Sequence, residues 1–161
     1  MSILLAKLLL LVFVANGAPI LVRWLMAGRF AYPVDAGCKF IDGKRLLGKA
    51  KTWRGILASV IATMLLALFL ELGWYTGLLI SCGAMAGDLL SSFIKRRCAL
   101  PTSAKAPLLD QIPESLLPLL LVAPVFALRI VDIILLVLLF FVFELLLSKL
   151  LYRLGIRQQP Y

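Results

Sequence analysis

Residues 135–147 read LLVLLFFVFELLL, an apolar run that only Glu144 interrupts. The run lies within a segment from Ile130 to Leu151, which is long enough to cross the roughly 30 Å hydrocarbon core of a bilayer as a helix. The whole chain shares this character, because 63% of its 161 residues are hydrophobic and 16% are charged. Soluble domains have about 45–50% apolar and about 25% charged residues. The composition predicts an integral membrane protein rather than a soluble globular enzyme.

Five apolar segments of this kind follow one another along the chain. The expected spans run from Ser2 to about Val22, from Ile56 to Leu72, from Trp74 to Ile94, within Leu108–Leu128, and from Ile130 to Leu151. Asn16-Gly17-Ala18-Pro19 is expected to interrupt the first span. A signal peptide is the alternative for that span, because Lys7 precedes a short apolar stretch that ends in small residues. The predicted fold is an all-α integral membrane domain over residues 1–161, with about five transmembrane helices and two cytoplasmic loops.

Basic residues are distributed very unevenly between the two ends of these spans. Of the 17 Lys and Arg residues, only Lys7 and Arg129 lie outside three segments: the loop from Arg23 to Arg54, the loop after the third span, and the C-terminal end. In a five-span chain these three segments share one side of the membrane. The positive-inside rule therefore predicts that the two loops and the C-terminus are cytoplasmic, in a multi-pass protein of the cell (inner) membrane.

The first cytoplasmic loop combines cations with glycines. Its last part, Gly48-Lys49-Ala50-Lys51-Thr52-Trp53-Arg54-Gly55, ends where the second span begins. Thr52 is the expected N-cap of that helix, so free N–H groups and the positive helix end would lie beside Lys51 and Arg54. This combination predicts a phosphate-binding segment. The alternative is a solvated basic loop held near anionic lipid headgroups, where each basic residue contributes about 1 kcal/mol.

The third span ends in a polar face. On a helix, residues separated by four and seven positions share a face, so Asp88, Ser92 and Lys95 align, with Arg96 adjacent. An aspartate inside an apolar span costs about 2.5–3.5 kcal/mol on insertion scales and is usually functional. The pattern predicts a carboxylate that holds a divalent cation, with the hydroxyl and lysine facing a phosphate. An Asp–Lys pair that only stabilises the helix end is the alternative.

Two further acids lie where the fourth span enters the membrane, in Asp110-Gln111-Ile112-Pro113-Glu114. Pro113 suits the first turn of a helix and Glu114 suits its positive end, so a simple helix start explains them in part. They also put carboxylates at the depth of Asp88 on the neighbouring helix. Paired acids beneath a basic loop are typical of a site for metal and polyphosphate. Zinc and a disulfide framework are not expected, because the chain has no histidine and its three cysteines form no C-x-x-C pair.

Taken together, these motifs resemble the CDP-archaeol synthase family, which is similar to the phosphatidate cytidylyltransferases. The resemblance covers Asn16 to Gln111 and is specific only as a combination. It is carried by Asn16-Gly17-Ala18-Pro19, Pro33-Val34-Asp35-Ala36-Gly37, Asp42-Gly43, Gly48 with Lys51-Thr52-Trp53-Arg54-Gly55, Gly87-Asp88, Ser92-Phe93-Ile94-Lys95-Arg96-Arg97 and Asp110-Gln111.

The resemblance implies a magnesium-dependent reaction of CTP with a lipid phosphate, 2,3-di-O-geranylgeranylglyceryl phosphate or a related lipid, in phospholipid biosynthesis. Its products would be a CDP-lipid and pyrophosphate. Carried over by motif, the residues that hold the metal would be Asp88 and Asp110. Phosphate contacts would come from Ser92, Lys95 and Arg96, and the triphosphate or lipid phosphate would be bound by Lys51, Thr52 and Arg54. Asp88, Lys95 and Asp110 would be catalytic.

The sequence departs from the family pattern in two places. Archaeal members tend to read D-Q-x-D, whereas Pro113 occupies the fourth position here and an acid follows at Glu114. Glu114 is therefore a candidate replacement metal ligand. The glycine pattern expected after the K-R-R element is replaced by Cys98-Ala99-Leu100-Pro101-Thr102-Ser103. These changes affect the expected lipid more than the expected reaction.

Two other kinds of protein would fit part of the pattern. A membrane transporter would use acids through the membrane depth, but only Glu71, Asp132 and Glu144 lie away from the cytoplasmic end. A non-catalytic partner subunit with a basic face for lipid headgroups would not need Asp88 or Asp110. Nucleic acid is not an expected partner, since the chain has no soluble module that could read a groove. No sequence feature indicates an oligomeric state.

Overall fold

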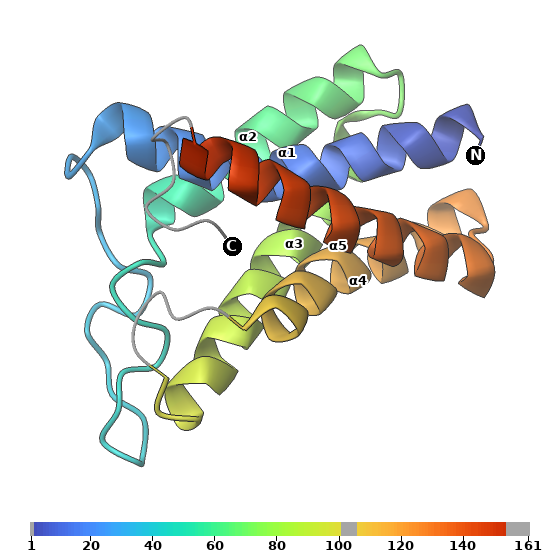
Figure 1. The fold of residues 1–161 in the computed structure, drawn as a ribbon. Coiled ribbons are helices and arrows are strands. Elements are labelled where there is room, and N and C mark those ends of the chain that lie inside the picture. The colour runs from blue at the N-terminus through green and yellow to red at the C-terminus, as the bar shows by residue number, and fades with distance from the viewer. Residues whose placement is uncertain (1, 101–105, 154–161) are drawn as a thin grey trace.

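The protein is a bundle of five helices, seen here in a computed structural model that describes residues 2–100 and 106–153 (Figure 1). Lys105, Arg157 and Pro101-Thr102-Ser103 lie outside the described residues. The helices are α1 (Ile3–Met26), α2 (Trp53–Phe69), α3 (Trp74–Arg97), α4 (Pro107–Phe126) and α5 (Ile130–Arg153). The expected all-α fold with five apolar helices is confirmed. Among the described residues, β-type pairing is limited to two isolated bridges.

Four helices, all except α2, are long and apolar enough to cross a membrane, and α2 is a shorter apolar helix of 17 residues. Large apolar side chains point outward from the bundle, as expected where lipid replaces water. On α2, Leu57, Ile61 and Leu65 follow one face and are 58%, 57% and 61% exposed. Lys7 of α1 donates from Nζ to the Leu70 carbonyl at 2.8 Å, which satisfies a backbone acceptor at the end of this short helix.

Helix α1 is longer than predicted and continues through Asn16-Gly17-Ala18-Pro19, so the expected interruption is wrong. Proline lacks an N–H and therefore frees the carbonyl four residues earlier, here that of Ala15. The buried Ser59 hydroxyl of α2 donates to this carbonyl at 2.7 Å. Membrane helices tolerate proline when a neighbour satisfies the freed group in this way. The motif therefore joins α1 to α2 instead of ending a helix.

Helix α4 also begins earlier than predicted. Pro107 occupies its first turn, so Pro113 and Glu114 lie in the second turn, not at the helix start as expected. Pro118 frees the carbonyl of Glu114, and the Asn16 side chain of α1 donates to that carbonyl at 3.5 Å, a long hydrogen bond. Asn16 thereby links α1 to the stretch of α4 that carries the predicted acid.

Three glycines let α3 lie against the backbones of its two neighbours. A Cβ on Gly77 would be 2.6 Å from the Met64 Cα of α2, and one on Gly83 would be 2.6 Å from the Pro118 Cα of α4. A Cβ on Gly87 would lie 2.7 Å from the Glu114 backbone nitrogen. Small residues at such crossings allow close approach of membrane helices. The close contact at Gly87 brings Asp88 next to the acid-bearing part of α4.

Candidate active site

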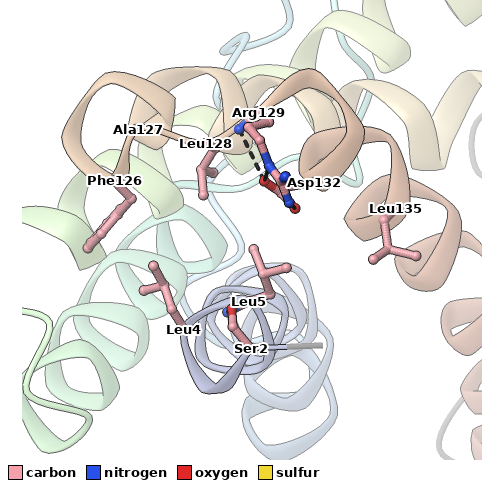
Figure 2. Close-up of a pocket in the computed structure, with 9 residues that line it drawn as sticks. All are labelled: Ser2, Leu4, Leu5, Phe126, Ala127, Leu128, Arg129, Asp132 and Leu135. Carbon is pink, nitrogen blue, oxygen red and sulfur yellow. Dashed lines mark hydrogen bonds and ion pairs between the residues drawn. The ribbon is translucent and has the colours of Figure 1, made fainter.

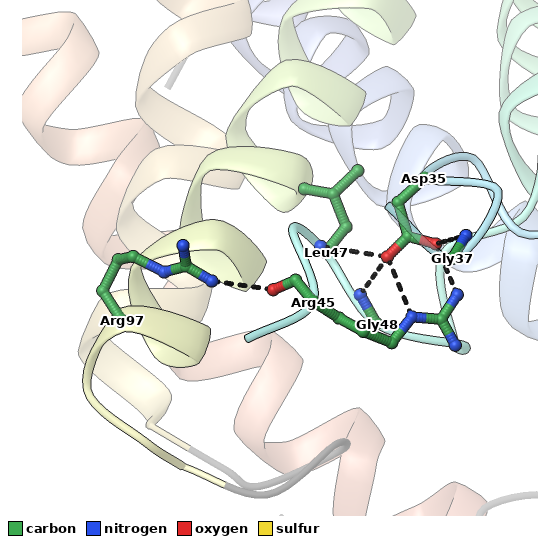
Figure 3. A network of polar contacts seen from close by, with 6 residues as sticks. All are labelled: Asp35, Gly37, Arg45, Leu47, Gly48 and Arg97. Carbon is green, nitrogen blue, oxygen red and sulfur yellow. Dashed lines mark hydrogen bonds and ion pairs between the residues drawn. The ribbon is translucent and has the colours of Figure 1, made fainter. Parts of the chain in front are cut away.

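A single buried aspartate organises the loop between α1 and α2. The side chain of Asp35 is fully buried and accepts hydrogen bonds from the backbone nitrogens of three residues (Figure 3). These nitrogens belong to Gly37 at 3.0 Å, Leu47 at 3.2 Å and Gly48 at 2.9 Å. The Arg45 guanidinium forms an ion pair with it at 2.6 Å. Gly37 and Gly48 have φ values of +86° and +100°, which explains why glycine stands at these turns.

The electrostatics of this loop favour the ionised carboxylate. Burial of Asp35 by itself raises its pKa. The Arg45 guanidinium and the backbone N–H groups together lower the pKa by more than burial raises it, so it lies well below the usual range. Because the pKa is lowered in the folded state, this interaction stabilises the loop at every pH above the unfolded pKa of about 3.9. The stabilisation is lost only as pH falls below that value.

We expect Asp35→Asn to lower the free energy of unfolding by about 3 kcal/mol at neutral pH, because it leaves Arg45 without its buried partner. Thermal unfolding in detergent and proteolysis of the loop would measure the loss. Asp42→Asn is the matched control: its carboxylate is 35% exposed, so the expected loss is below about 1 kcal/mol. Equal loss in both variants, or a wild-type loop that opens between pH 7 and 5, would contradict this assignment.

Arg97 fastens the same loop to the end of α3. Its guanidinium donates to the Arg45 carbonyl at 2.8 Å (Figure 3) and forms an ion pair with Asp42 at 3.0 Å. It also lies over the rings of Phe40 and Phe93, 4.8 and 4.9 Å from their centroids. Arg97 and Asp35 both lie in the motifs that carry the family resemblance, but the sequence predicted no contact for either of them. A lone acid between Pro33-Val34 and Ala36-Gly37 was the signal that could have identified Asp35 as a turn residue.

The loop places Lys51 next to Asp88 of α3. The Lys51 carbonyl accepts from the Val34 nitrogen at 2.8 Å, and its side chain forms an ion pair with Asp88. Glu114 of α4, which is partly buried, belongs to the stretch of α4 that packs against Gly87, the residue before Asp88, and it interacts electrostatically with Asp88. Residues from a loop and two helices therefore form one cluster of two neighbouring carboxyl groups and an ammonium group.

A second ion pair lies about two helical turns farther along α3. Lys95 Nζ is 2.6 Å from Asp110 Oδ1 of α4, and Lys95, Arg96 and Ser92 are all buried. The predicted alignment of Asp88, Ser92 and Lys95 on one face of α3 thus agrees with the contacts that Asp88 and Lys95 make. Both predicted lysines are paired with predicted acids.

Two predicted phosphate-binding residues make different contacts. Arg54 donates to the backbone carbonyls of Ala27, at 2.7 Å, and Arg29, and so binds the chain just after α1. Thr52 occupies the N-cap position of α2 as predicted, but its side chain makes no capping hydrogen bond. The structure does not bring Arg54 into contact with the Asp88 cluster, and a role for either residue with phosphate stays a prediction.

The donor chemistry of the cluster suits magnesium that is only partly held by protein. Within residues 2–100 and 106–153, no group of three or more His, Cys, Asp or Glu side chains could hold a metal ion. Asp88 and Glu114 are adjacent, whereas Asp110 contacts Lys95. Magnesium is usually bound by one or two carboxylates, with substrate phosphates and water as the other ligands. Two adjacent carboxyl groups fit this pattern, and they favour Glu114 over Asp110 as the partner of Asp88.

A surface pocket of about 330 Å³ lies at the other end of the bundle, where α1 begins and α4 turns into α5 (Figure 2). Arg129 and Asp132 form an ion pair at 3.0 Å at its edge, and Leu4, Leu5 and Leu135 supply much of its apolar lining. None of the predicted site residues contributes to this pocket. The predicted site residues lie instead toward the loop end of the bundle, defined here as the end that carries residues 27–52.

Comparison with known proteins agrees with this arrangement. A family model described as "CarS-like: CDP-archaeol synthase" matches residues 1–161. The chain is 37% identical over 135 residues to the CDP-archaeol synthase of Sulfurisphaera tokodaii, covering 80% of this chain and 81% of the relative. It is 39% identical over 104 residues to that of Hyperthermus butylicus, covering 61% of this chain but only 59% of the relative, which is less than two thirds.

A solved structure is also similar over most of the chain. It is described as an intramembrane enzyme for archaeal membrane lipids biosynthesis, and it superposes with a TM-score of 0.73 at 30% identity. The superposition covers 88% of this chain and 90% of that one. The chain thus shares its overall fold with that intramembrane enzyme. The chain belongs to the CDP-archaeol synthase family.

Proposed function

We propose that the protein is a membrane cytidylyltransferase that makes a CDP-activated lipid from CTP and a lipid phosphate. A phosphate oxygen of the lipid attacks the α-phosphorus of CTP, forming a new P–O–P linkage. The bond from the α-phosphorus to the β-phosphate breaks, and pyrophosphate leaves with the electron pair. The observation that carries this proposal is the pair of lysine–carboxylate contacts, Lys51–Asp88 and Lys95–Asp110, beneath a basic loop.

The residues present suit this reaction. The attacking phosphate oxygen is already ionised at neutral pH, so no general base is required and the absence of histidine is no obstacle. Catalysis then depends on positioning and on neutralising charge around the α-phosphate. Lys95 and Arg96, both buried on α3, would contact phosphate oxygens, while Lys51 would bind the triphosphate or the lipid phosphate.

Asp88 and Glu114 would hold Mg²⁺, with Asp110 as a further candidate ligand. When bound, Mg²⁺ supplies charge neutralisation at the phosphate oxygens and helps to align the two substrates. The Lys95–Asp110 contact orients the lysine on its side of the site, and the neighbouring Ser92 would bind phosphate. The lipid tails would lie along the apolar outer faces of the helices, within the bilayer.

The decisive experiment is incubation of the purified protein with labelled CTP, Mg²⁺ and a panel of lipid phosphates. The panel contains archaetidic acid (the archaeal diether lipid phosphate), phosphatidic acid and the ether analogue of phosphatidic acid. We expect CDP-lipid and pyrophosphate in equal amounts, with more than one acceptor used, because apolar grooves distinguish lipids by only about 1–3 kcal/mol per misfit methylene. If a folded protein makes no CDP-lipid from any of them, a transporter or partner-subunit role becomes the better explanation.

The proposed orientation has the loop end of the bundle in the cytoplasm, where CTP is present. Cys38 and Cys98, both exposed at this end, should resist an impermeant thiol reagent added to intact cells and react after the membrane is permeabilised. Tyr75→Cys at the opposite end of α3, in a chain that lacks both native cysteines, should react in intact cells. Efficient labelling of Cys38 and Cys98 in intact cells would mean that the loop end faces the outside and that the proposed orientation is wrong.

A further inference from the structure

The Lys51 side chain occupies an unusual position for a phosphate-binding lysine. Unlike the exposed Lys49 two residues earlier, it forms an ion pair with Asp88 and is only 24% exposed. Its charge also acts on Glu114, whose backbone packs against Gly87, the residue before Asp88. One ammonium group therefore attracts two neighbouring carboxyl groups.

Two neighbouring carboxyl groups repel each other when both are ionised, and a nearby cation relieves that repulsion. In this state of the protein the cation is Lys51. A divalent cation bound by Asp88 and Glu114 would need the same oxygen atoms. Lys51 and the metal are thus competitors for one site, and the lysine must release Asp88 before a metal can bind there.

The surroundings of Lys51 allow that release without unfolding the loop. Its backbone is held on both sides: the carbonyl accepts from the Val34 nitrogen at 2.8 Å, and α2 begins two residues later. The side chain has four rotatable bonds and reaches Asp88 from a loop. Exchange therefore needs only a change of side-chain rotamer, and the ammonium group would remain close to whatever binds at the carboxylates.

We propose that Lys51 acts as an internal substitute for the metal, and that metal and triphosphate enter the site as one unit. This inference rests on the proposed function. Metal alone would have to displace Lys51 and leave the lysine without an anionic partner, and the described protein residues offer it only two adjacent carboxyl groups. A metal–triphosphate complex brings the missing oxygen ligands and gives Lys51 a new anionic partner. Lys51 then moves from Asp88 to the phosphates.

The test measures Mn²⁺ binding to the purified protein in detergent by electron paramagnetic resonance, with Mn²⁺ alone and with Mn²⁺ plus the α,β-methylene analogue of CTP. Wild-type protein should bind Mn²⁺ weakly by itself and much more tightly with the analogue. Lys51→Met should bind Mn²⁺ alone about tenfold more tightly, since the competing charge is gone. The same variant should bind the analogue with Mn²⁺ less tightly. Opposite changes in these two affinities are the signature of exchange.

Lys49→Met is the matched control, because it removes an exposed lysine two residues earlier in the same loop and should leave Mn²⁺ affinity at the wild-type value. If Lys51→Met does not fold, Lys51→Gln keeps a hydrogen-bond donor at Asp88 and makes the same measurement possible. Unchanged or weaker Mn²⁺ binding in the folded variant overturns the inference. If the wild-type protein nevertheless makes CDP-lipid, that result contradicts only the exchange of Lys51 and leaves the proposed function intact. Tighter Mn²⁺ binding without any CDP-lipid formation would instead sink the proposed function.

Discussion

Asp88→Asn is expected to lower kcat by about 10²-fold or more while the protein stays folded in the membrane. The substitution removes a negative charge that would hold the metal and, through it, stabilise charge in the transition state. It also removes the anionic partner of Lys51, but asparagine has nearly the same volume, so the contact between α3 and α4 at Gly87 is preserved. Turnover with saturating CTP and lipid phosphate measures the effect, and size-exclusion chromatography in detergent checks folding.

The control for this variant is Asp132→Asn. Asp132 also forms an ion pair near a helix end, but with the exposed Arg129 at the far end of the bundle, so turnover should stay within about twofold of wild type. Glu114→Gln is the informative companion, because Glu114 lies near Asp88 and interacts with it electrostatically, whereas Asp110 contacts Lys95. A larger loss in Glu114→Gln than in Asp110→Asn would identify Glu114 as the second metal ligand. Full activity of Asp88→Asn would refute the metal assignment.

Much of this architecture could be predicted from periodicity and composition alone. Apolar length predicted all five helices, because a membrane span needs about 20 apolar residues whatever its neighbours are. The 3.6-residue repeat predicted that Asp88 and Lys95 share a face of α3. The beginnings of α3 and α5, at Trp74 and Ile130, also matched. These features depend on local sequence and on the bilayer.

Features that depend on partners far along the chain could not be predicted in this way. Pro19 was expected to interrupt α1, and it does not, because Ser59 donates to the freed Ala15 carbonyl from 44 residues away. Asp35 resembled any loop acid until its four hydrogen-bond donors came together. Arg54 was assigned to phosphate from its position beside Lys51, but its guanidinium reaches back to the end of α1. Sequence spacing gives no information on such long-range contacts.

The second large effect is expected from Gly87→Ala, which adds one methyl group and changes no charge. The new Cβ would lie 2.7 Å from the Glu114 backbone nitrogen and closer still to the Pro113 carbonyl oxygen. These are backbone atoms of α4, so no side chain can rotate away and the helices must separate. Overpacking of this kind costs about 1–3 kcal/mol of stability. Displacement of α4 by about 1 Å would also separate Glu114 from Asp88, and a shift of that size can cost about 10²-fold in rate.

Gly17→Ala is the control that separates this clash from any general effect of replacing a helical glycine. Gly17 lies inside α1, and a Cβ there would meet nothing within 4 Å. Alanine in a helix interior is more favourable than glycine by about 0.5–1 kcal/mol, so Gly17→Ala should unfold at the same temperature or a higher one. Gly87→Ala should unfold at a lower temperature and lose most of its turnover. Wild-type turnover and melting temperature in Gly87→Ala would mean that the α3–α4 contact does not hold the two carboxyl groups together, because only a loose contact could accept the extra methyl group.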